Sequence, residues 1–148
     1  MNLILMFGND RPQSPVFSIP SGMYNNPFEL SLSSEKGTQI YYSLDGSSPE
    51  TDGILYTEPI TVYDRSGEVS ILRLKRNVVY DWMNEPEPEP EQTDHCFVVR
   101  AVAINADGKV SEPTIGTYFV NKKMEGRTVI CLTADPDDLR SEERRVGK

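Results

Sequence analysis

The stretch of residues 40–46 constrains the fold of this chain more than any other feature. Within it, Ile40, Tyr42 and Leu44 alternate with other residues, and this period of two is typical of a half-buried β-strand. An Asp-Gly pair then ends the strand, because both residues tolerate the positive φ angles of a tight turn at low cost. We therefore expect the next apolar segment, residues 54–56, to return as a neighbouring strand or to lie across the sheet edge.

The rest of the chain repeats this pattern of short apolar runs separated by Gly, Pro, Asn and Asp, with no credible long helix. Four further runs are predicted to be strands: residues 28–33, 60–63, 96–104 and 114–120. The run 96–104 is apolar almost throughout, which is typical of a central strand covered on both faces, with Arg100 pointing outward. The last run should pair back on it as a hairpin. The pattern predicts an all-β fold, a two-sheet antiparallel sandwich of about seven short strands.

Composition along the chain suggests four segments. We expect residues 1–13 to be a flexible leader, with an extra edge strand or the remnant of a cut precursor as alternatives. Residues 14–122 form the sandwich. Residues 123–139 read as a linker and the first strand of a truncated following domain, and residues 140–148 as a charged tail that is disordered or non-native.

A long acidic insertion, residues 64–95, interrupts the sandwich and exceeds the usual length of a loop in a compact domain. Residues 69–75 could form a short strand within it. Residues 85–91 alternate Glu and Pro. Such a sequence neither pairs in a β-sheet nor forms a helix, because Pro lacks the amide donor and the carboxylates repel each other. A solvated, extended spacer is the expected state of this run.

The charge of the chain argues against two classes of partner. The formal net charge is −8, whereas nucleic-acid binding requires a basic face to neutralise phosphates. The same charge argues against anionic membrane surfaces. No apolar run reaches the roughly 18 residues that a membrane-spanning helix needs. We therefore expect neither nucleic acid nor membrane insertion.

The sequence contains no credible catalytic constellation. His95 has no Ser or Cys nucleophile in a suitable turn nearby, and no Gly-rich phosphate loop occurs. The Glu-Pro run cannot hold two carboxylates at a fixed separation. Asp45 and Asp52 could contribute to a calcium site, but an Asp that caps its own turn is the favoured interpretation. The prediction is therefore no catalytic, cofactor-binding or metal residue, and no cofactor.

Two cysteines, Cys96 and Cys131, each lie in an apolar run. Buried free thiols are the favoured interpretation, because Cys packs like a small hydrophobic residue. A disulfide remains an alternative for an exported chain. A metal site at His95 and Cys96 has less support, because no second pair of ligands follows at a suitable spacing.

Aromatic residues offer the one candidate ligand contact. Trp82 and Tyr80 lie in the insertion, where they could stack on a sugar ring or anchor the insertion onto the sandwich. Other aromatics, such as Tyr24, Tyr41 and Tyr63, are expected to fill the core or to cover neighbouring strands. The anchoring interpretation is favoured for Trp82 as well.

Several motifs occur in an order that resembles a known family. They are Phe-Ser at 17–18, Ser-Gly at 21–22, Tyr-Ser-Leu-Asp-Gly-Ser at 42–47, Pro-Ile at 59–60, Val-Arg-Ala-Val-Ala at 99–103, and Gly-Thr-Tyr-Phe-Val at 116–120. Over roughly residues 15–120, the chain resembles the immunoglobulin/fibronectin III-like module named after the C-terminal domain of chitobiases and β-hexosaminidases. The variant it resembles most precedes spore-coat H-type (CotH) kinase domains in bacterial surface proteins. Residues 128–139 resemble the first strand of the region that comes next in such proteins.

The resemblance implies a non-catalytic accessory module, a spacer or interaction domain from the N-terminal side of a CotH-kinase-like surface or exported protein. It would not be an enzyme, would be a monomer, and would lie outside the cell or on its surface. Its partner would be the downstream domain of the same polypeptide. The alternative is a carbohydrate-binding module of a glycan-active enzyme, with a glycan as partner.

Overall fold

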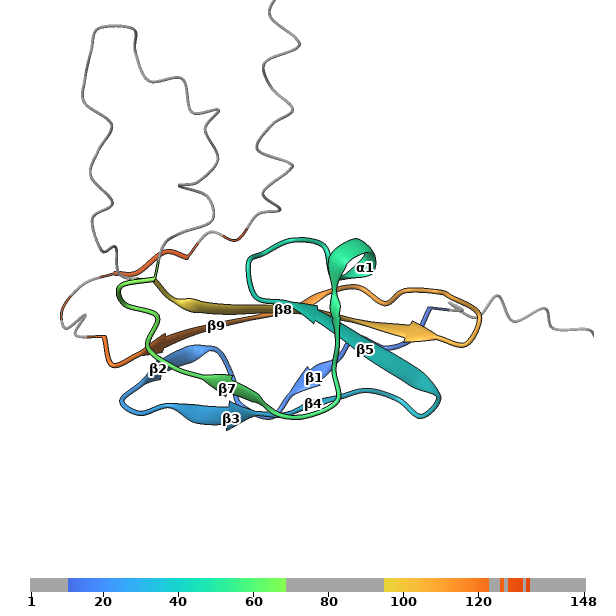
Figure 1. Cartoon of the computed structure of the whole chain (residues 1–148), viewed down its shortest axis with the longest axis horizontal. Coiled ribbons are helices and arrows are strands. Elements are labelled where there is room, and N and C mark those ends of the chain that lie inside the picture. Colours follow the sequence, from blue (N-terminus) through green and yellow to red (C-terminus); the bar gives the residue numbers. More distant parts are fainter. Residues whose placement is uncertain (1–10, 69–94, 123–125, 127, 132, 134–148) are drawn as a thin grey trace, which may run out of the picture.

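The computed structural model describes residues 11–68, 95–122, 126, 128–131 and 133 (Figure 1). This part of the chain is almost entirely β-structure. Its elements are β1 (Val16–Phe17), β2 (Gly22–Tyr24), β3 (Phe28–Leu30), β4 (Leu32–Ser33), β5 (Thr38–Ser43), α1 (Pro49–Asp52), β6 (Ile54–Leu55), β7 (Ile60–Val62), β8 (Phe97–Asn105) and β9 (Thr114–Val120).

The strands form two facing layers, which confirms the predicted β-sandwich. One layer is a five-stranded sheet in the order β2-β9-β8-β5-β6, and the other consists of the pairs β1-β4 and β3-β7. Figure 1 shows these pairs beneath the long strands β5, β8 and β9. Apolar side chains on the facing surfaces are thereby removed from water.

The centre of the larger sheet has the predicted pattern. Strand β8 pairs antiparallel with both β5 and β9, with Tyr42 opposite Ala101 and Val99 opposite Gly116. Strand β6 returns antiparallel to β5, with Ile54 opposite Tyr42, so the first of the two expectations for residues 54–56 is confirmed. A turn at residues 105–108 reverses the chain after β8, and Gly108 there has a φ of 75°.

One strand pair is parallel, contrary to the prediction of a purely antiparallel sandwich. Gly22 of β2 lies opposite Tyr118 of β9, and the two strands run in the same direction. The N-terminal segment enters beside the start of β9, where Thr114 Oγ1 donates to the Pro15 carbonyl at 2.7 Å. Further along, Tyr118 Oη donates to the Ile19 carbonyl at 2.9 Å. A segment that runs beside β9 from its start to its end must pair in parallel.

The single strand predicted at residues 28–33 is split in two. Strand β3 pairs with β7, whereas β4 pairs with β1. Ser31 lies between them, and its carbonyl accepts from Ser18 N at 2.9 Å while its amide donates to Ser18 Oγ at 3.0 Å. The run therefore changes partner at Ser31 without leaving its layer.

The core lies between the two layers. Phe97, Val99, Ala101 and Ala103 face inward from β8, as predicted, with at most 2 % of each exposed. The opposing layer contributes a second set of buried side chains: Leu30, Leu32, Ile60 and Val62. Burying an aliphatic or aromatic side chain of this size stabilises the fold by about 1.5–3 kcal/mol.

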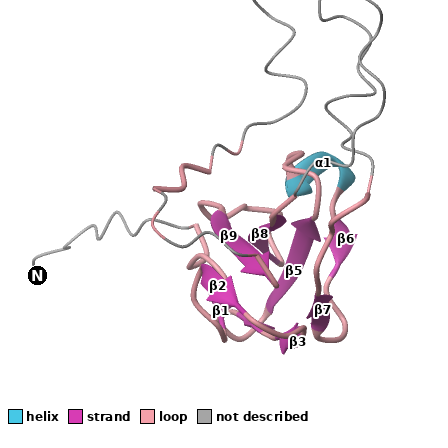
Figure 2. Ribbon diagram, turned by 90° about the vertical axis from the view of Figure 1, so that its left-hand side faces the viewer, coloured by secondary structure: helices cyan, strands magenta, loops and turns pink. Residues whose placement is uncertain are grey.

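The outer face of the large sheet is covered in part by α1, a single helical turn where the sequence predicted only loop (Figure 2). Pro49 begins the turn, since its fixed φ suits a first helical position, and it packs against the sheet with its side chain fully buried. Val102 on β8 is correspondingly only 1 % exposed. Within the described residues, no helix is long and apolar enough to cross a membrane.

Two further observations concern the two ends of the module. Residues 11–13, assigned to the leader, contact the module: Pro12 is buried and Arg11 Nη1 lies 2.7 Å from Glu112 Oε1. The strand predicted at 128–132 is not formed at residues 128–131, which pair with none of the described strands. A β-strand needs a hydrogen-bonded neighbour, so apolar composition alone did not produce one here.

Candidate functional site

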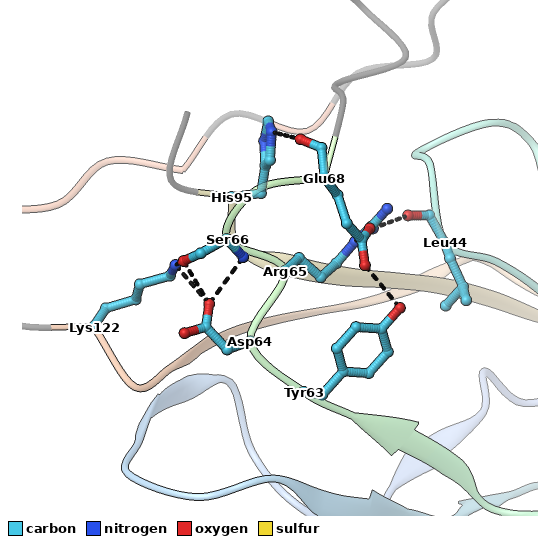
Figure 3. A network of polar contacts seen from close by, with 8 residues as sticks. All are labelled: Leu44, Tyr63, Asp64, Arg65, Ser66, Glu68, His95 and Lys122. Atoms are coloured by element: carbon cyan, nitrogen blue, oxygen red, sulfur yellow. Dashed lines mark hydrogen bonds and ion pairs between the residues drawn. The ribbon is translucent and has the colours of Figure 1, made fainter. Parts of the chain in front are cut away.

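A network of polar contacts joins three points of the chain that are far apart in sequence (Figure 3). They are the segment after β7, the segment before β8 and the segment after β9. We call this network the junction, and its members are Tyr63, Asp64, Arg65, Ser66, Glu68, His95 and Lys122. It lies where the insertion 64–95 begins and ends and where the chain leaves β9.

Asp64 organises the first half of the junction. Its Oδ1 accepts from Ser66 N at 2.9 Å and from Ser66 Oγ at 2.7 Å, a local turn of the kind Asp favours. The same oxygen lies 2.7 Å from Lys122 Nζ, which also contacts Ser66 Oγ. The Lys122 side chain is only 4 % exposed, so its charge is neutralised within the junction. Lys122 and the Ser66 donors together hold the pKa of Asp64 well below its usual range.

Arg65 and Glu68 organise the second half. Arg65 Nε lies 2.7 Å from Glu68 Oε2, and Arg65 Nη1 donates to the Leu44 carbonyl at 3.1 Å. The guanidinium also stands over the Phe97 ring, 5.6 Å from its centroid. Tyr63 Oη donates to Glu68 Oε1 at 2.9 Å. The Arg65 hydrogen bond lowers the pKa of Glu68, and the bond to Glu68 raises the pKa of Tyr63.

His95 closes the base of the insertion. Its Nε2 lies 2.9 Å from the Glu68 carbonyl oxygen, so residues 68 and 95 meet although 27 positions separate them. The junction thus pairs opposite charges and holds together the segments that follow β7, precede β8 and follow β9. Its geometry suits a mechanical role, because each charged group is directed at another part of the protein. Among the described residues, no cluster of three or more His, Cys, Asp or Glu side chains could hold a metal ion.

The two cysteines meet at the same end of the sandwich. Cys96 Sγ lies 3.6 Å from Cys131 Sγ, and both are free thiols. Burial and the contact with Cys131 raise the pKa of Cys96 to about 11. The prediction of buried thiols is wrong for Cys131, which is exposed, because residues 128–131 do not enter the core.

The structure describes some of the other candidate residues and leaves out two of them. Trp82 and Tyr80 lie outside the described residues. Asp45 Oδ1 accepts from Ser47 N at 3.0 Å and from Ser47 Oγ at 2.5 Å, which confirms the predicted turn. Tyr24 packs against Phe28 with ring centroids 4.6 Å apart, as expected for an aromatic that covers the core.

Sequence reasoning missed the junction. The run Asp-Arg-Ser-Gly at 64–67 carries a recognisable turn signal, and that signal alone would have located the Asp64–Ser66 contact. The pairing of Asp64 with Lys122 spans 58 positions, and no local pattern reveals it. Only the strand topology brings the end of β7 and the end of β9 together.

The two-layered strand architecture is that of a fibronectin III/immunoglobulin-like β-sandwich module. The model of the Fn3 associated family matches residues 28–118, so the chain belongs to this family. The match confirms the resemblance as far as an Fn3/Ig-like module. Neither the curated proteins nor the solved structures include a match to this chain.

Proposed function

We propose that this protein is a non-catalytic accessory module that acts as a spacer within a longer bacterial surface or exported polypeptide. The observation that carries the proposal is the path of the chain. It enters the module at the start of β9 and leaves at the end of β9. A module crossed from end to end holds its N-terminal and C-terminal neighbours apart.

The contacts at the two ends define this path. Arg11 pairs with Glu112, two residues before β9 begins, and Lys122, two residues after β9 ends, pairs with Asp64. Strand β9 spans seven residues between them, about 20 Å at the usual rise. Figure 1 shows the N-terminal segment entering on the right and β9 ending on the left.

A tandem of two full-length copies tests the spacer role. Small-angle scattering should show a maximum dimension that increases by about one module length when the second copy is added. The increase is expected because the exit of one copy and the entry of the next lie at opposite ends of the sandwich. Copies that fold side by side, with little increase, would contradict the proposal.

The position ahead of a CotH-kinase-like domain rests on the sequence resemblance of residues 15–120 and 128–139. The genomic DNA downstream of the Leu139 codon tests this placement. We expect an open reading frame that continues into a kinase-like domain. A frame that continues into an unrelated domain would remove the assignment and leave the spacer role intact.

The carbohydrate-binding alternative gives a different result in a glycan array. The spacer proposal predicts no binding by the full chain. Binding that is lost in Trp82→Ala and kept in Tyr41→Ala would instead establish a carbohydrate-binding module. Sugar hydrolysis or phosphoryl transfer by the purified chain would contradict the non-catalytic assignment.

A further inference from the structure

We propose that Cys96 and Cys131 form a reversible disulfide bond that fastens the segment after β9 to the start of β8. The bond would be a redox-controlled tie beside the junction. Its formation depends on the positions of the two thiols and is independent of the spacer role.

The two sulfur atoms are already in contact. They lie 3.6 Å apart, whereas a disulfide bond is about 2.0 Å long, so closure needs an approach of less than about 2 Å. The residues are 35 positions apart, and the fold alone brings them together. Cys96 precedes Phe97, which is fixed opposite Tyr118 in the sheet. One partner of the bond is therefore held by the core.

The other partner lies on a weakly packed segment. Cys131 is exposed, and its neighbours Val129 and Ile130 are 36 % and 80 % exposed. Residues 128–131 form no strand. A covalent bond at Cys131 would hold this segment far more firmly than its described contacts do, and it would restrict the direction in which the chain continues.

The reaction needs an external oxidant, and a small disulfide such as oxidised glutathione supplies it. The exposed Cys131 thiolate attacks one sulfur of that disulfide, forms a mixed disulfide and releases one thiolate. The Cys96 thiolate then attacks Cys131 Sγ and releases the second thiolate. Overall the protein loses two protons and two electrons, and the oxidant is reduced to two thiols.

The environment of Cys96 makes the closing step depend on pH. Burial raises the pKa of Cys96, so only a small fraction is thiolate at neutral pH, and the nearby Arg65 opposes this effect. The closing rate should increase about tenfold per pH unit through the neutral range, because the thiolate is the attacking species.

The test is oxidation of the full 148-residue chain by oxidised glutathione under native conditions. We expect both thiols to be consumed, the mass of the chain to fall by two hydrogens, and a non-reducing peptide map to link the peptides that contain Cys96 and Cys131. Dithiothreitol should reverse all three changes. In urea, the equilibrium constant for closing against glutathione should be at least about tenfold smaller, because the fold no longer holds the sulfurs in contact.

Two variants serve as controls. Cys96→Ser should stop at a mixed disulfide on Cys131, and Cys131→Ser should remain mostly unmodified because Cys96 is half-buried. A thermal melt of each variant confirms that it is folded. The proposal is wrong if, at equilibrium, the folded wild-type chain retains the Cys131 mixed disulfide, forms intermolecular dimers, or shows an equilibrium constant for closing that is no larger than in urea.

Discussion

At the scale of single residues, Gly116 shows how tightly the two layers approach. A Cβ at this position would lie 2.6 Å from Tyr118 Oη and 2.7 Å from the Phe17 ring. Tyr118 cannot move easily, because it is fully buried and its hydroxyl donates to the Ile19 carbonyl. Glycine at residue 116 thus permits contact between β9 and the N-terminal segment.

We predict that Gly116→Ala destabilises the module. Overpacking a filled core destabilises the folded state by about 1–3 kcal/mol. Replacing Gly by Ala also lowers the entropy of the unfolded chain, but this stabilises the protein by only about 0.4–1 kcal/mol. Urea unfolding should therefore show a net decrease in the free energy of unfolding. Gly22→Ala is the matched control, since its Cβ would meet nothing nearer than 3.6 Å, and it should be neutral or slightly stabilising. Equal losses in both variants would show that close packing at Gly116 is not the cause.

Asp64 gives a prediction about pH. Its folded-state pKa lies below the unfolded value of about 3.9, so its contribution to stability is present above that value. The contribution is lost as the pH falls through the folded-state pKa. Asp64→Asn should lower the melting temperature by a few degrees near neutral pH, and its difference from wild type should shrink as the pH falls below about 4.

Thermal melts across this pH range test the prediction. Asp107→Asn is the control, because Asp107 is exposed in the turn after β8. The melting temperature of Asp107→Asn should equal that of the wild type at every pH. A gap between Asp64→Asn and wild type that stays constant down to a pH of about 2 would show that ionisation of Asp64 does not stabilise the junction.

At the scale of elements, β8 continues its pairing beyond the turn through a side chain. Ser111 Oγ accepts from Ala103 N at 2.9 Å and donates to the Glu112 carbonyl at 2.9 Å. Ser111 N also donates to the Ala103 carbonyl at 2.9 Å. Because Ala103 is fully buried, no water replaces the serine hydroxyl.

We predict that Ser111→Ala destabilises the module by about 1–3 kcal/mol, the cost of a buried amide without an acceptor. Chemical unfolding measures the loss, and amide exchange at Ala103 should become faster. Ser33→Ala is the control, since Ser33 is exposed at the edge of the smaller layer and should change stability by less than about 0.5 kcal/mol. Unchanged exchange at Ala103 would contradict the assigned hydrogen bond.

The elements also show how far the sequence could predict this structure. Strands β5, β8 and β9 are predictable from alternation and continuous apolar runs, because their side chains face a core on at least one side. The split at Ser31 and the parallel β2–β9 pair are not predictable in this way, since each depends on a partner strand distant in sequence. The junction was missed for the same reason, and the one local signal was the Asp64 turn.

At the scale of the whole molecule, β2, the second strand of the chain, lies beside β9, the last strand that the structure describes. Three residue pairs join β2 to β9 in parallel, from Gly22↔Tyr118 to Tyr24↔Val120. Two further bonds flank them: Thr117 N donates to Ser21 Oγ at 3.0 Å, and Asn121 N donates to the Tyr24 carbonyl at 2.8 Å. Tension applied through the two ends of the module would pull these strands past each other.

We predict that the module withstands a larger force when β2 and β9 are pulled past each other along their length than when they are pulled apart from one end. Pulling from the N-terminus and the C-terminus loads the β2–β9 bonds together, because β2 is drawn toward the start of β9 while β9 is drawn the opposite way. Moving the first attachment to the exposed Asn25 places both attachments at one end of the pair, so the bonds break in succession. Forced unfolding is governed by the unfolding rate, which depends on how many bonds must break at once.

Single-molecule pulling of Asn25→Cys in a Cys96→Ser, Cys131→Ser background should therefore give a lower rupture force than pulling the same background through its ends. The cysteine substitutions remove the proposed disulfide, so the comparison reports the strand pair alone. Each event should release about 3.5 Å per unfolded residue, which identifies a full opening of the module. Equal forces in the two geometries would mean that the β2–β9 pair carries no load, and the spacer would then owe its resistance to the core between its layers.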